Sequence, residues 1–142
     1  MTKGMALAAV GFAVSMLAVP VQAHHAISAN VILTTSINTK AVLTRIDWIN
    51  PHIWMRFDLL HADGTREKNI MIESLGIAAL RQVGIDSKAA LGVGGTFDVT
   101  YYPNRNGAPG GFMSKLILPD GRELNVTNLD PTAIPPGTPA TQ

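Results

Sequence analysis

The sequence predicts a mainly β fold: a small closed or partly open barrel of five to six strands with one short helix. Three observations lead to this prediction. Apolar and polar residues alternate along several short segments, turns rich in glycine and proline separate these segments, and one segment alone after residue 23 has the spacing of an amphipathic helix. The 142 residues include no cysteine, so packing has to stabilise the domain without disulfides.

Two strands are expected before the first proline of the domain. Segment 30–36 is rich in β-branched residues and is expected to be a short strand, and segment 40–49 a longer one. Pro51 interrupts the second strand because proline has no N–H to donate to a ladder. The alternation in the longer strand places four residues on one face: Val42, Thr44, Ile46 and Trp48.

A hairpin is the clearest element of the sequence. Segments 52–61 and 66–73 alternate with period two around an Asp63-Gly64 turn. The residues expected to face the core are Ile53, Met55, Phe57, Leu59, Ile70 and Ile72. The residues expected to face outward or into a groove are His52, Trp54, Arg56 and Asp58.

The helix is expected at 74–83, with Ser74 as its cap, Gly84 at its end, and a buried stripe of Ile77, Leu80 and Val83. Strands at 96–102, 111–118 and 123–126 follow, with Phe97, Val99 and Tyr101 sharing a face. Three strands, a helix and further strands is the order of an OB-like barrel, a five-stranded Greek-key design.

Both ends of the chain are predicted to lie outside this domain. Lys3, an apolar run at 5–19 and Val21-Gln22-Ala23 before a cleavage point have the pattern of a signal peptide at 1–23. A membrane anchor is the alternative, but the apolar run is shorter than the ~20 residues that a spanning helix needs. The sequence thus predicts export to the periplasm without a stable membrane anchor, one domain at 24–128, and a proline-rich flexible tail at 129–142.

The charge balance excludes one class of partner. The chain has 11 basic and 10 acidic residues, and loss of Lys3 with the signal peptide leaves ten of each. Nucleic-acid binding requires clustered basic side chains, whereas these are scattered among acids. The expected partner is therefore an unknown protein or small molecule, and not a nucleic acid.

Five motifs resemble those of one family of small exported bacterial proteins, known only as a domain of unknown function (family six-one-five-two). They are His24-His25, Trp48-Ile49-Asn50-Pro51-His52-Ile53-Trp54, Glu73, the loop 103–111 and Leu118-Pro119-Asp120-Gly121-Arg122. The chain departs from the family pattern at Ala26-Ile27, Asp47 and Gly76-Ile77. The resemblance implies a periplasmic setting and no known activity, so function has to be argued from the site.

The expected mature amino terminus is the first candidate site. Cleavage after Ala23 would give His24 a free α-amine beside its own imidazole, and His25 adds a second ring. Nitrogen-rich ligands of this kind favour copper(II), ahead of zinc or nickel. His52 is the natural third ligand, whereas His61 lies about 30 Å along the same strand. The alternatives are a histidine pair that is disordered or serves only cleavage, and a His52 that only hydrogen bonds a turn.

The outward face of segment 52–61 is the second candidate. Trp54 offers an apolar platform beside Arg56, and OB barrels bind oligonucleotides and sugars on such faces. The alternative is that the amino-terminal segment or the tail covers Trp54. Arg105 lies in a glycine-rich loop and is expected to grip a carboxylate or phosphate, although a bulged connection between strands explains the same glycines. For Glu73, the alternative to a role in the site is a structural one, as a carboxylate at the start of the helix, where the helix dipole favours negative charge.

Catalytic motifs are not visible. The sequence has no cysteine and no serine in a nucleophile elbow. The sequence therefore favours a binding or carrier protein over an enzyme. Two hypotheses remain: a copper site at His24, His25 and His52, and a metal-free module that binds a partner or small ligand at Trp54, Arg56 and Arg105.

Overall fold

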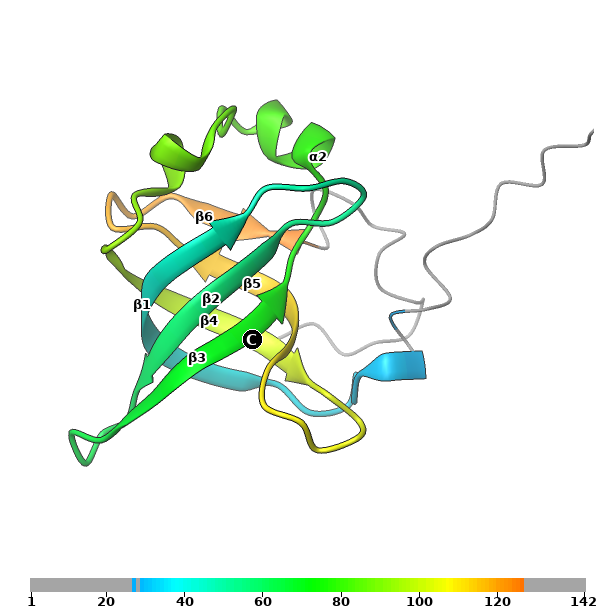
Figure 1. The fold of residues 1–142 in the computed structure, drawn as a ribbon, viewed down its shortest axis with the longest axis vertical. Coiled ribbons are helices and arrows are strands. Elements are labelled where there is room, and N and C mark those ends of the chain that lie inside the picture. The colour runs from blue at the N-terminus through cyan, green and yellow to red at the C-terminus, as the bar shows by residue number, and fades with distance from the viewer. Residues whose placement is uncertain (1–26, 28, 127–142) are drawn as a thin grey trace, which may run out of the picture.

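The computed structural model describes residues 27 and 29–126, and six strands of one sheet form the body of this part of the chain (Figure 1). The strands are β1 (Ile37–Asp47), β2 (Trp54–Leu60), β3 (Arg66–Glu73), β4 (Thr96–Pro103), β5 (Gly111–Ile117) and β6 (Glu123–Asn125). Between β3 and β4 lie the helix α2 (Ile77–Gln82) and a 3-10 helix, η1 (Lys88–Leu91), which the sequence pattern did not predict. The predicted signal peptide and tail fall outside the described residues.

The sheet curls into a partly closed ring. Its strand order is β3-β2-β1-β4-β5-β6, and all of these neighbours are antiparallel. A further, parallel pairing joins β3 to β5 through Ile72↔Gly111 and Glu73↔Phe112. Because only two residue pairs make this closure, the five strands form a ring and not a complete barrel. The mainly β class with one short helix predicted from the sequence is therefore confirmed, with a partly closed ring in place of the barrel.

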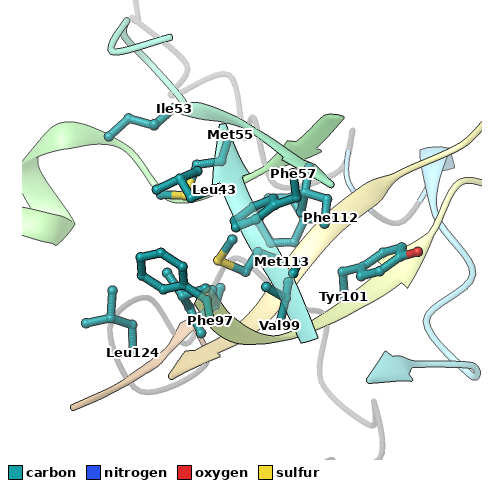
Figure 2. Packing of buried hydrophobic residues seen from close by; sticks show 14 of the residues in the cluster. Leu43, Ile53, Met55, Phe57, Phe97, Val99, Tyr101, Phe112, Met113 and Leu124 are labelled. Atoms are coloured by element: carbon teal, nitrogen blue, oxygen red, sulfur yellow. The ribbon is translucent and has the colours of Figure 1, made fainter. Parts of the chain in front are cut away.

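The buried hydrophobic residues form one core, and Figure 2 shows how several of them pack together. Phe57 of β2 and Phe97 of β4 meet edge to face, with ring centroids 6.4 Å apart. Burial of each large apolar side chain contributes about 1.5–3 kcal/mol. The residues predicted to face the core from the hairpin and from β4 are all buried: Ile53, Met55, Phe57, Leu59, Ile70, Ile72, Phe97, Val99 and Tyr101.

The prediction for β1 was wrong in two respects. The strand begins at Ile37 and not at residue 40, and the four residues predicted to share a face do not all lie on one side. The buried residues are Ala41, Leu43 and Ile46, whereas Thr44 is exposed. The pairing of β1 with β2 shifts between Leu43 and Arg45, and such a bulge reverses the alternation beyond it. The strand expected at 30–36 is also absent from the described residues, where Val31 makes one isolated bridge to Asn104.

The predicted helix starts later than expected. The Ser74 N–H donates to the Ile53 carbonyl, and the Ser74 hydroxyl donates to the sulfur of Met113 at 3.7 Å. Ser74 therefore continues the strand pairing, and Gly76 takes the N-cap position of α2. Leu80 is buried as predicted. Within residues 27 and 29–126, no helix is both long and apolar enough to cross a membrane.

Candidate functional site

A row of cross-strand neighbours crosses the seam where β3 meets β5. Trp54 of β2 is opposite Glu73 of β3, Glu73 is opposite Phe112 of β5, and Phe112 is opposite Tyr102 of β4. Residues in directly opposite positions place their side chains on the same face of a sheet. Four strands therefore bring aromatic rings to both sides of one carboxylate. Burial raises the pKa of the Tyr102 phenol above its ordinary value.

A pocket of about 400 Å³ opens beside this row. Its volume is typical of small-molecule sites, which occupy roughly 300–1,000 Å³. Three parts of the chain form its walls: the seam of the ring, the first described residues, and the loop between β4 and β5. The lining residues are Ile27, Ala29, Asn30, Val31, Trp54, Glu73, Asn104, Arg105, Asn106, Gly111 and Phe112.

Hydrogen bonds hold the amino-terminal wall of the pocket against the β4–β5 loop. The Arg105 N–H donates to the Asn30 carbonyl at 2.8 Å, and Arg105 Nη2 donates to the Val31 carbonyl at 3.0 Å. Ile27 and Val31 of the amino-terminal segment are buried, and this segment and the loop lie side by side in Figure 1. Arg105, predicted as a ligand-binding residue, thus lies at the pocket and uses part of its side chain to fix the pocket wall.

Two glycines let the β4–β5 loop return to the sheet. Gly110 has φ +100°, and a Cβ there would overlap the Met71 carbonyl oxygen. A Cβ on Gly111 would overlap the Tyr102 carbonyl oxygen. Side chains at these positions would push β5 away from β3 and β4. The glycines of the loop therefore close the ring beside the pocket.

His52 and Glu73 form the polar centre of the site. His52 Nδ1 donates a hydrogen bond to Glu73 Oε1, and the two side chains are only 23% and 25% exposed. The His52 and Phe112 rings meet in a T-shaped arrangement, with centroids 6.4 Å apart. Because Nδ1 is used, Nε2 is the ring nitrogen that remains for a ligand or a proton. Glu73 is thus a partner of His52 and not a helix-start carboxylate, since α2 begins at Ile77.

The backbone around His52 is also fixed. Its neighbour Ile53 exchanges hydrogen bonds with the segment after β3, where it accepts from the Ser74 N–H and donates to the Leu75 carbonyl. Gly76 packs so closely on Pro51 that a Cβ would overlap the Pro51 carbonyl oxygen. The peptide bond before Pro51 is cis. The β1–β2 loop that carries His52 is therefore packed directly against the start of α2.

Arg56 lies outside this pocket. Its Nη1 donates to Asn69 Oδ1 at 3.2 Å, and its Nε is 3.7 Å from Asp47 Oδ2. The structure therefore brings Trp54 and Arg105 to one pocket and gives Arg56 a place in a separate polar network. Asn104, Asn106 and Phe112 line the pocket without having been predicted to do so. The two asparagines directly precede and follow Arg105 in the sequence, and this position beside a predicted site residue could have indicated them.

The predicted metal ligands are tested only in part. His24 and His25 lie outside the described residues. Among residues 27 and 29–126, no three histidine, aspartate or glutamate side chains gather as a metal site. His61 lies at the other end of β2, exposed, with Nε2 3.8 Å from Glu67. His52 is thus the one predicted ligand that the structure describes, and a complete site would need donors from outside that part.

Comparison with known proteins gives one match. A family model described as a family of unknown function (DUF6152) matches residues 12–113. Neither the curated proteins nor the solved structures give a match to the chain. The activity of the site therefore has to be argued from its own geometry.

Proposed function

The chain belongs to this family of unknown function, and from that premise we propose that it is an exported protein that binds copper(II) through His24, His25 and His52. Cleavage after Ala23 is part of the proposal, because it would give His24 the free α-amine that completes a chelate with its imidazole. His25 and His52 would add two further imidazoles. A nitrogen-rich ligand set of this kind favours copper(II) over other divalent ions.

The observation that carries the proposal is the hydrogen bond from His52 to Glu73. Histidines that bind metals usually donate their second ring N–H to a carboxylate, which fixes the tautomer and raises the basicity of the other nitrogen. His52 has this arrangement, with Nδ1 on Glu73 and Nε2 remaining. The pair is partly buried, so water weakens the interaction less than at an exposed position.

The position of the pair along the chain supports a shared site. Glu73 and Ile27 both line the pocket. His25 precedes Ile27 by only two residues in the sequence, and two residues span at most about 7 Å. The chain therefore allows His25 to lie no more than about 7 Å from a residue of the pocket that Glu73, the hydrogen-bond partner of His52, also lines.

Copper titration of two amino termini tests the proposal. One protein has the native start at His24, and in the other the α-amine of His24 is acetylated. Acetylation keeps every side chain and removes the α-amine from the chelate. We expect at least tenfold weaker copper(II) binding by the acetylated protein. Equal binding by both proteins, or binding by neither, would refute the proposal.

A second candidate is a metal-free module that binds a small ligand at Trp54. The pocket beside Trp54 favours it, because two aromatic residues, a carboxylate and three asparagine side chains line one hollow. The two candidates are separable, since Trp54→Ala removes part of the pocket and none of the proposed copper ligands. We expect this variant to retain copper(II) binding.

A further inference from the structure

We infer that the pocket beside Trp54 takes a neutral saccharide ring. This inference rests on the second candidate above and is independent of copper binding. It follows from three properties of the pocket: an aromatic side chain that lines it, polar groups held in fixed directions, and a balanced charge. Each of these properties comes from contacts within residues 27 and 29–126.

The aromatic side chain that lines the pocket is that of Trp54. Its backbone neighbours Ile53 and Met55 are fully buried, whereas Trp54 is partly exposed and lines the pocket. Phe112 supports the same wall and is itself buried. Indole combines a broad apolar face with one N–H donor. The C–H face of a pyranose ring has the matching chemistry, since it is apolar and is bordered by hydroxyl groups.

The polar groups of the pocket are held in fixed directions. Asn104 Nδ2 donates to the carbonyls of Ala108 and Pro109, which orients its Oδ1 acceptor. Asn106 Oδ1 accepts the Ala108 N–H, which orients its Nδ2 donor. One carboxylate oxygen of Glu73 binds His52, and Oε2 is the second acceptor. Planar groups that mix donors and acceptors suit the hydroxyls of a sugar, which both donate and accept.

The charge of the pocket argues against an ionic ligand. The Glu73 carboxylate already faces His52, and the Arg105 guanidinium is anchored on the Val31 carbonyl. An ion would therefore have to compete with these contacts, whereas a neutral ring would leave them in place. The pocket volume of about 400 Å³ is large enough for one sugar ring. OB folds are also known to bind oligosaccharides on one face of the barrel.

Calorimetric titration of the mature protein in EDTA tests this inference without any metal. The probes are cellotetraose and chitotetraose, which are neutral, and tetragalacturonate and chitosan tetramer, which are charged. We expect a neutral probe to bind, Trp54→Ala to weaken it at least tenfold, and Trp54→Phe to retain most of the affinity. His61→Ala, at the far end of β2, is the matched control and should bind as the native protein does.

Three results would overturn the inference. Binding of only the charged probes at Trp54 would support a ligand pocket and refute the neutral class. Failure of all four probes would refute the saccharide itself. Equal affinity of Trp54→Ala and the native protein would place the sugar elsewhere. Copper titrations are measured separately, so none of these results bears on the copper proposal.

Discussion

His52 Nδ1 donates to Glu73 Oε1 across 21 residues of sequence, and this bond joins the β1–β2 loop to the end of β3. The pair lies at the seam of the ring, where Glu73 is also the register partner of Trp54 and Phe112. Glu73 therefore has three roles. Its backbone takes part in the strand pairing, and its side chain both lines the pocket and orients His52. Changes at Glu73 should separate these roles.

Glu73→Ala should weaken copper(II) binding about tenfold, because loss of a carboxylate that orients a metal-binding histidine costs 10- to 100-fold in affinity. The copper(II) affinity of Glu73→Gln should fall between those of the native protein and Glu73→Ala, since the glutamine amide oxygen still accepts a hydrogen bond from His52 Nδ1. The measurement is competition with a chelator of known affinity. The matched control is Glu67→Ala, which removes the partner of the exposed His61 and should leave copper binding unchanged. A Glu73→Ala protein with native affinity would remove Glu73 from the site.

Gly110→Ala should destabilise the fold by at least about 3 kcal/mol. The added Cβ would overlap the Met71 carbonyl oxygen, and φ of +100° disfavours any side chain. Gly107→Ala is the control, because it has a similar positive φ but open space around its Cβ, and it should cost about 1 kcal/mol. Urea denaturation of both variants measures the difference. Equal losses would mean that the close approach of Gly110 to β3 does not stabilise the ring.

Gly76→Ala should lower both stability and copper affinity. Its backbone has an ordinary φ of −70°, so the effect would come from the overlap of the Cβ with the Pro51 carbonyl oxygen, which displaces the loop that carries His52. Gly64→Ala, in the open β2–β3 turn, should lower stability and leave copper affinity unchanged. Unfolding and copper titrations of both proteins make the comparison. A Gly76→Ala protein that loses stability but keeps native affinity would show that the packing of Gly76 on Pro51 does not position His52.

Alkaline pH should destabilise the protein through Tyr101 and Tyr102. Burial raises the pKa of both phenols, so the folded state holds these protons more tightly than the unfolded state. Their contribution to stability is complete below the ordinary tyrosine pKa and is lost as the pH rises through the raised values. Absorbance near 295 nm should show late ionisation in the native protein, and Tyr102→Phe should make stability less sensitive above about pH 10. Ionisation of all tyrosines at the ordinary pKa would contradict this.

The hairpin and β4 could be predicted in detail because strict alternation records which side faces the core. Met55, Phe57 and Val99 are buried as the pattern requires. The alternation failed in β1, where a bulge at Thr44 reverses the faces. A bulge depends on pairing with β2, which is a long-range property that the local sequence does not specify. The late helix start has a similar cause, since Ser74 is bound to Ile53 of another strand.

The candidate site was predictable in its residue types and not in its grouping. Trp54 and Arg105 were selected from motifs, and both line the pocket. Their meeting depends on the closure of β3 on β5 and on the contact of Asn30 with Arg105, which join distant segments. Arg56 was grouped with Trp54 because both face outward on one strand. Its actual neighbours, Asp47 and Asn69, lie on the adjoining strands.

The proposed coordination of copper by His52 is tested most directly by electron paramagnetic resonance of the copper(II)-loaded mature protein with its native His24 start. Three proteins are compared: the native chain, His52→Ala, and His61→Ala as the matched control. We predict that His52→Ala changes the parallel g value and hyperfine splitting, whereas His61→Ala leaves both unchanged, because only the first variant loses a ligand nitrogen. Identical spectra from the native protein and His52→Ala would contradict the account.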